Sequence, residues 1–118
     1  MSARRVLVVE DEAMVAMLIQ DLLAELNCEV TLVASNAAQA ADFAQTCDVD
    51  FALLDVNLGG GQTSFQAATI LGQRRMPFAW ITGYGRDGVP ASFSGAPILS
   101  KPIDPRQLAK VIARLGEG

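Results

Sequence analysis

The sequence predicts an α/β fold in which one five-stranded parallel sheet is covered by helices on both faces. Two observations indicate this fold class. Short apolar runs alternate with stretches of helical periodicity along the whole chain of 118 residues. The best of these runs are apolar at consecutive positions, which is typical of strands that are buried on both faces. Because parallel neighbours need crossover connections, the pattern predicts a doubly wound sheet in one domain, residues 1–118.

Three strands and two helices are predicted in the first half of the chain. The first helix spans about residues 12–26, where apolar residues recur at helical spacing. Asn36 is a suitable N-cap for an alanine-rich second helix that ends near Gln45. Apolar or β-branched runs place the strands at residues 5–9, 29–34 and 49–54.

The second half of the chain is less regular. A glycine loop at residues 59–61 precedes a weaker helix at about residues 64–73. Residues 83–96 contain four glycines and Pro90, so any helix there is short and poorly supported. Asp104 is a capping residue for the last helix, which has proline at its first position. The remaining strands are predicted at residues 77–82 and 97–100.

Composition excludes several classes of function. The chain has no histidine, which removes Ser-His-Asp catalysis and the usual zinc sites. A formal net charge of -4 argues against a nucleic-acid binder. Cys28 and Cys47 form no CxxC pair, so we expect reduced thiols in the core. Because the chain has neither a targeting segment nor an apolar stretch of about 20 residues, we expect a cytoplasmic protein that does not bind membranes.

Polar side chains follow four of the five predicted strands: Glu10 and Asp11, then Asp55, Thr82 and Lys101. Parallel strands deliver their carboxyl ends to one edge of the sheet, so these side chains should meet there. Three carboxylates that close repel one another, and the usual remedy is a divalent cation. The set suits phosphoryl transfer to a carboxylate, with Asp55 on the central strand as the nucleophile.

These motifs resemble those of the receiver domains of bacterial two-component response regulators. The family implies a flavodoxin-like fold with strand order 2-1-3-4-5, here with a degraded fourth helix, and a cis peptide before Pro102. The resemblance runs from Arg5 to Leu115 and is carried by Glu10-Asp11, Leu53-Leu54-Asp55-Val56-Asn57, Thr82-Gly83 and Lys101-Pro102.

The resemblance also implies a chemistry. Asp55 would accept a phosphoryl group from a histidine kinase or a histidine phosphotransfer protein. Thr82 and Lys101 would contact that group. The chain would be a signalling module that catalyses only its own phosphorylation and dephosphorylation, and a downstream protein partner would receive the signal. Mg²⁺ would be held by Glu10, Asp11, Asp55 and the backbone carbonyl of Asn57.

Three features depart from the family pattern. The glycine loop replaces the usual proline-containing turn, the helix at residues 83–96 is degraded, and Ile98 stands where Tyr or Phe is common. Without that aromatic ring, we expect signalling to run through ordering of residues 83–96. The run from Pro77 to Gly85 is similar to a subgroup of single-domain receivers with a Phe-x-x-x-Thr-Gly-Tyr type motif, which implies a stand-alone regulator without an output domain.

Three alternatives stay open. A phosphatase of the haloacid dehalogenase type needs a general-acid Asp where Asn57 stands, and a cap domain as well. A flavodoxin-like cofactor binder needs a phosphate loop after the first strand, where Glu10 and Asp11 would repel phosphate. A degenerate receiver would act as a phosphate-independent protein-binding module, a reading that Ile98 favours.

Three side chains near the predicted site have two interpretations each. We expect Met14 and Met17, on the first helix, to pack partly into the core, because Met commonly fills gaps. The alternative is an apolar docking patch for a helical partner, as the family implies. Tyr84, two residues after Thr82, either shields the phosphoryl group from water or covers the edge of the sheet.

Overall fold

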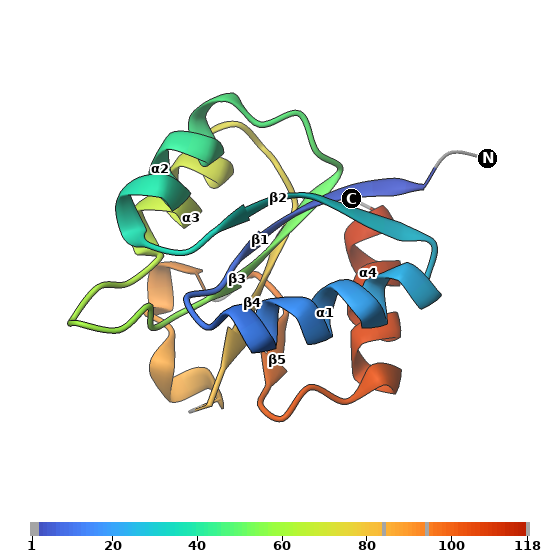
Figure 1. Cartoon of the computed structure of the whole chain (residues 1–118). Helices are drawn as coiled ribbons and strands as arrows, with labels where there is room; N and C mark the ends of the chain where they lie inside the picture. The colour runs from blue at the N-terminus through green and yellow to red at the C-terminus, as the bar shows by residue number, and fades with distance from the viewer. Residues whose placement is uncertain (1–2, 84, 94, 118) are drawn as a thin grey trace.

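The structure, a computed structural model, describes residues 3–83, 85–93 and 95–117 (Figure 1). Tyr84 lies outside the described residues. The strands form one sheet in the order β2-β1-β3-β4-β5, and every neighbouring pair is parallel. This confirms the doubly wound fold, with β3 in the centre. The strands are β1 (Arg4–Val9), β2 (Cys28–Ala34), β3 (Phe51–Asp55), β4 (Phe78–Thr82) and β5 (Ile98–Ser100); the helices are α1 (Ala13–Glu25), α2 (Ala37–Thr46), α3 (Phe65–Gln73) and α4 (Pro105–Glu117).

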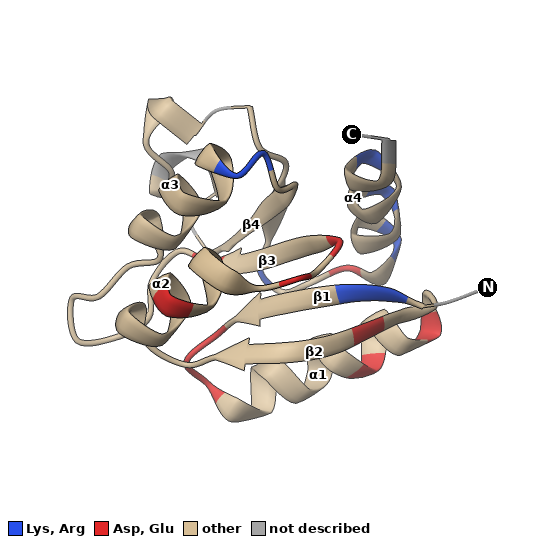
Figure 2. Cartoon of the chain, turned by 90° about the horizontal axis from the view of Figure 1, so that it is seen from above, with Lys and Arg blue, Asp and Glu red and all other residues tan. Residues whose placement is uncertain are grey.

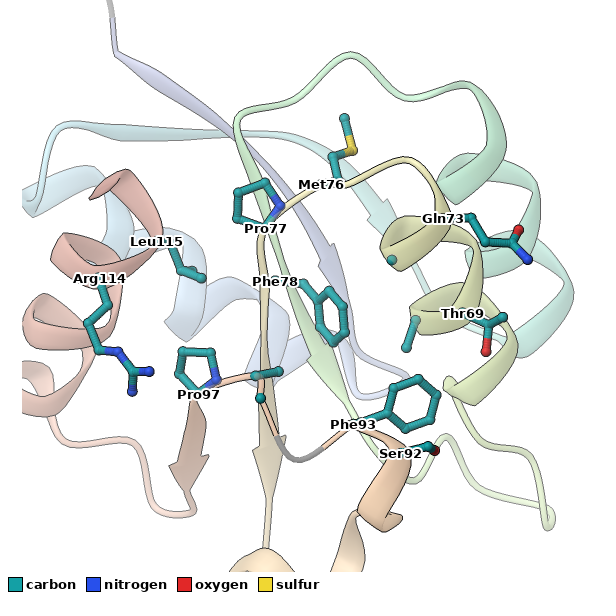
Figure 3. A pocket seen from close by; sticks show the side chains of 14 residues that line it. Thr69, Gln73, Met76, Pro77, Phe78, Ser92, Phe93, Pro97, Arg114 and Leu115 are labelled. Carbon is teal, nitrogen blue, oxygen red and sulfur yellow. The ribbon is translucent and has the colours of Figure 1, made fainter. Parts of the chain in front are cut away.

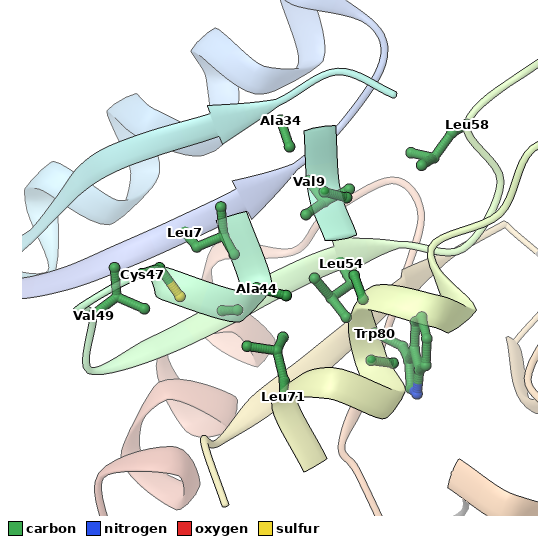
Figure 4. Packing of buried hydrophobic residues seen from close by; sticks show 14 of the residues in the cluster. Leu7, Val9, Ala34, Ala44, Cys47, Val49, Leu54, Leu58, Leu71 and Trp80 are labelled. Atoms are coloured by element: carbon green, nitrogen blue, oxygen red, sulfur yellow. The ribbon is translucent and has the colours of Figure 1, made fainter. Parts of the chain in front are cut away.

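Helices cover both faces of the sheet, and the core has two halves. Along β1, Leu7 and Val9 face α2 and α3, whereas Val6 and Val8 face α1 and α4. Figure 4 shows the half on the side of α2 and α3, which Trp80 closes toward β5. All five residues of β3 are buried, as its uninterrupted apolar sequence predicts.

The helix ends follow the predicted capping. The Asn36 side chain accepts a hydrogen bond from the Gln39 N–H at 2.8 Å, and the Asp104 side chain accepts one from the Arg106 N–H at 2.8 Å. Such caps satisfy N–H groups that have no partner within the helix. Cys28 and Cys47 are free and buried, which confirms the expectation for both thiols. Among the described residues, no helix has both the length and the apolar character needed to cross a membrane.

The exposed face of α1 contradicts one prediction. Met14 is 84% exposed and Met17 is 62% exposed, so the expectation that they pack partly into the core is wrong. The helix contacts the sheet through Ala16, Ile19 and Leu23 instead, which are spaced by three and four residues. Because these residues fill the buried face, the two methionines fall on the solvent side.

The connection between β4 and β5 contains no α-helix in its described residues. Two short 3₁₀ turns, η1 (Gly85–Gly88) and η2 (Ala91–Phe93), take its place, as the glycine content of this segment predicts. The indole of Trp80 is covered by three aromatic rings, of which Phe65 belongs to α3 and Phe93 to η2. Its centroid lies 5.4 Å from that of Phe93, 5.5 Å from that of Phe78 and 5.8 Å from that of Phe65.

The first strand and the last helix are joined by Arg4. Its guanidinium lies 4.5 Å from the centroid of the Phe51 ring and donates a hydrogen bond to the Ile112 carbonyl at 3.1 Å. A Cβ atom at Gly116 would come within 3.2 Å of Arg4 Nη1. A small residue at position 116 therefore leaves room for this contact.

Candidate functional site

The predicted acidic residues meet at the carboxyl edge of the sheet. Figure 2 shows acidic residues in the segment that leaves the tip of β1. Carboxylate oxygens of Glu10, Asp11 and Asp55 all lie within 4.8 Å of one another. Glu10 and Asp55 are buried, with 1% and 3% of their surfaces exposed, whereas Asp11 faces solvent. The ends of two neighbouring strands, β1 and β3, thus hold a carboxylate cluster in which two side chains are buried and one faces solvent.

Lys101 is the positive charge of this cluster. Its Nζ atom lies 2.9 Å from Asp55 Oδ2 and 3.7 Å from Glu10 Oε1. The backbone places it there, because the Lys101 N–H donates to the Thr82 carbonyl at 2.9 Å and extends the pairing of β5 with β4. The Lys101–Pro102 peptide is cis, as the family resemblance implies.

Burial and crowding set the charge of Glu10. Removal from water raises the pKa of its carboxyl group to about 7, and the nearby Asp55 charge acts in the same direction. The Glu12 N–H, which donates to Glu10 Oε2 at 3.1 Å, only partly opposes this rise. Near neutral pH, and without a metal ion, Glu10 is therefore partly protonated.

Lys101 remains charged at this edge. Burial alone lowers its pKa, but the hydrogen bond and charge of Asp55, with the charges of Glu10 and Glu12, raise it above the usual value. The ammonium group therefore partly neutralises the cluster, and two buried carboxylates share one lysine.

Thr82 and Asn57 complete the predicted set. Thr82 is fully buried at the end of β4, where the neighbouring Ile81 pairs with Asp55 of β3. Asn57 is exposed, two residues beyond Asp55, and forms an isolated antiparallel bridge with Thr63. The structure thus places all six predicted residues at the same edge of the sheet.

Two residues that sequence reasoning missed also support the site. The Ser64 hydroxyl is buried and donates to the backbone carbonyl of Asp55 at 2.6 Å, while the Ser64 N–H donates to the Val56 carbonyl at 3.1 Å. These bonds fix the backbone that carries Asp55. A serine at the start of a predicted helix reads as an ordinary cap, so its sequence gave no signal of this role.

Gly59 is the second of these residues. Its φ is +79°, and a Cβ atom there would lie 3.2 Å from Asp11 Oδ2. Glycine both permits this backbone conformation and lets the loop after β3 approach the Asp11 carboxylate. The glycine loop at residues 59–61 indicated an unusual backbone conformation, but the sequence does not show that Gly59 approaches Asp11, which is distant in the chain.

Comparison with known proteins agrees with this geometry. A family model described as the response regulator receiver domain matches residues 6–113. The solution structure of SdrG from Sphingomonas melonis Fr1 is similar, with 36% identity, coverage of 98% of each chain and a TM-score of 0.85.

Two further solved structures are also similar. The BeF3-activated conformation of SdrG from Pseudomonas melonis Fr1 has 37% identity, coverage of 98% of this chain and 99% of that one, and a TM-score of 0.79. The PhyR response regulator REC domain of Erythrobacter litoralis has 25% identity, coverage of 97% and 90%, and a TM-score of 0.82. Comparison with curated proteins gave no match.

Proposed function

The chain belongs to the response regulator receiver domain family, and we propose that it carries a phosphoryl group on Asp55 in an Mg²⁺-dependent phosphorelay. The observation that carries this proposal is the contact of Lys101 Nζ with Asp55 Oδ2 at 2.9 Å, inside a cluster of three carboxylates. A buried carboxylate that lies beside a lysine and two further acids suits the capture of a phosphoryl group.

The carboxylates fit a magnesium ion. Hard oxygen ligands are those that Mg²⁺ prefers, and among the described buried atoms Glu10 Oε1 has no hydrogen-bond partner. Glu10, Asp11 and Asp55 would hold the ion, together with the backbone carbonyl of Asn57. When bound, the ion supplies positive charge to the oxygens of the transferring phosphoryl group.

The residues of the chain have separate tasks in the transfer. A carboxylate oxygen of Asp55 attacks the phosphorus atom and forms an O–P bond. The P–N bond to the donor imidazole breaks, and its electron pair returns to the imidazole nitrogen. Lys101 compensates charge on a phosphoryl oxygen, and the Thr82 hydroxyl donates a hydrogen bond to another. Ser64 holds the Asp55 backbone still while this happens.

Two observations support a stand-alone role with a helical donor. The solved structure of SdrG is similar to this chain over 98% of the SdrG chain. The exposed Met14, Met17 and Leu18 on α1 form an apolar patch beside the acidic edge. A histidine kinase or a phosphotransfer protein would dock there, and the phosphorylated chain would act as a cytoplasmic signalling module on a downstream protein.

Labelling with acetyl phosphate tests this function. We expect a gain of one phosphoryl group in the intact mass, dependent on Mg²⁺ and absent in Asp55→Asn. Asp48→Asn is the matched control, because the Asp48 side chain is 89% exposed and outside the site. Asp48→Asn should label as the wild type does. If wild type is not labelled, or Asp55→Asn is labelled equally, the phosphorelay role is wrong; the first result would favour a phosphate-independent binding module.

A further inference from the structure

A cleft of about 750 Å³ lies at the end of β4 and β5 that is opposite the acidic edge. It is lined by α3, by residues 76–78 at the start of β4, by η2 and residues 95–97, and by the end of α4. Figure 3 shows Phe78 and Phe93 facing it, with Thr69 and Gln73 of α3 on one side and Arg114 of α4 on the other. Its size is that of sites that bind ligands or side-chain anchors.

The cleft exists because the described connection between β4 and β5 has no α-helix. On the same face of the sheet, α2 and α3 cover the preceding strands, while only two short turns cover β4 and β5. The half-buried residues that line the cleft are apolar, among them Met76, Phe78 and Phe93. A sheet face of this kind is normally covered by a helix.

The one charged residue among the described residues that line the cleft is basic. None of its described lining residues is acidic, and Arg114 is exposed at its rim. Lys110, also exposed, lies one turn earlier on α4. The chain as a whole carries a net charge of -4, so a basic rim is not a result of its composition. A guanidinium in this position is suited to bind a carboxylate.

We propose that this cleft binds an amphipathic helix of a partner protein, with apolar residues at positions i, i+3, i+4 and i+7 and carboxylates along the flank that faces Arg114. The apolar side chains of that helix take the place of the missing cover over Phe78 and Phe93. The carboxylates pair with Arg114 and Lys110 and set the direction of the helix. This surface is separate from the phosphoryl site, so it does not depend on the function proposed above.

Two synthetic peptides test the proposal. Both form the same helix with the same apolar face and carry a fluorescent label; one has glutamates along the flank and the other has lysines. We expect fluorescence anisotropy to show binding of the glutamate peptide that is at least about ten-fold tighter than binding of the lysine peptide. Trp80 is the only tryptophan of the chain and contacts both Phe78 and Phe93. Its emission should change when the glutamate peptide binds.

Variants of the full chain locate the binding site. Gly72 lines the cleft, and a Cβ atom there meets nothing within 4 Å. Gly72→Glu should therefore fold, weaken the glutamate peptide at least ten-fold and strengthen the lysine peptide, whereas Gly72→Ala should change neither. Arg114→Glu should weaken the glutamate peptide. Arg106→Glu, about 12 Å earlier along the helix axis, is the matched control and should have less than a two-fold effect.

Several results would overturn the proposal. Among these are no binding of the glutamate peptide, equal binding of both peptides, unchanged Trp80 emission, and equal effects of Arg106→Glu and Arg114→Glu. The last would mean attraction to α4 in general. Self-association of the chain in sedimentation, if Gly72→Glu abolished it, would identify a second copy as the occupant and would also contradict a helix from another protein.

Discussion

The two ends of β4 and β5 differ in how their side chains are satisfied. At the carboxyl end, Thr82 and Lys101 lie beside buried carboxylates, and charge dominates. At the amino end, Phe78 and the residues before Ile98 border an apolar cleft whose only described charged lining residue is Arg114. At the carboxyl end, Lys101 neutralises only part of the charge of the three carboxylates. At the amino end, apolar side chains remain partly exposed to solvent. The two ends of the same short strands therefore present surfaces of opposite chemical character.

Among the predicted effects, we expect the largest to be a dependence of folding stability on pH, caused by the buried carboxylates at the carboxyl end of the strands. Without metal, folded Glu10 keeps its proton up to about pH 7, whereas the unfolded chain loses it near the ordinary value of 4.5. The folded state binds more protons in this window, so the stability that Glu10 contributes is fully present below about pH 4.5 and is lost as the pH rises through 7. We expect a fall on the order of 2 kcal/mol between about pH 5 and 8.

Urea unfolding at a series of pH values measures this fall. Glu10→Gln should remove most of it, because the amide does not titrate. Glu25→Gln, at an exposed acid on α1, should leave it in place. An unchanged slope in Glu10→Gln would show that another group is responsible.

Two glycines of the loop after β3 separate backbone strain from crowding of the acidic edge. Gly59 has a φ of +79° and Gly61 a φ of +78°, but only at Gly59 does a Cβ atom meet a neighbour, Asp11 Oδ2 at 3.2 Å. Alanine at either position should cost about 1 kcal/mol of folding stability for the backbone. Gly59→Ala should in addition weaken Mg²⁺ binding, measured by calorimetry. Equal Mg²⁺ affinity in the two variants would exclude a role for the close approach.

Asp55→Ala should stabilise the metal-free protein by about 1 kcal/mol, a typical size for one substitution. The variant removes one of two buried carboxylates, and Lys101 still has Glu10 as a partner at 3.7 Å. Stabilisation by added Mg²⁺ should shrink at the same time. Thermal unfolding in EDTA and in Mg²⁺ measures both effects. A lower midpoint for Asp55→Ala in EDTA would show that its pairing with Lys101 outweighs the repulsion.

Gly72→Ala should have the smallest effect on folding stability, and its sign should be opposite to that of Gly59→Ala. Gly72 lies in the last turn of α3, and its Cβ position is open. Alanine there should stabilise the fold by up to about 1 kcal/mol, because it favours the helix. Chemical unfolding in parallel with Gly59→Ala gives the comparison directly. A loss of stability would mean that the cleft wall needs glycine for packing.

Sequence reasoning succeeded where a residue's place follows from its own neighbours in the chain. The apolar run before Asp55 predicted a buried central strand, and strand ends predicted the meeting of Glu10 with Lys101.

Sequence reasoning failed where the position of a residue depends on contacts between distant segments. Met14 and Met17 fit a helical face equally well on either side, and only the packing of Ile19 decides which side is buried. The tasks of Gly59 and Ser64 depend in the same way on how the loop returns to Asp11 and Asp55. The glycines of residues 83–96 predicted the missing helix beside the cleft, but nothing in the sequence predicted the cleft itself or Arg114 at its rim.

The strand order also has a kinetic consequence. β1 pairs with β3 through Val6 and Phe51, whereas β5, which precedes Lys101 directly, is the last strand in the chain and lies at the edge of the sheet. The pairing that brings the carboxylates of β1 and β3 together needs only the first 55 residues, whereas the position of Lys101 needs β4 and β5 as well. Such non-local parallel pairing folds slowly compared with helical bundles. A chain truncated before β5 would therefore carry the acids of this edge without the counter-charge of Lys101.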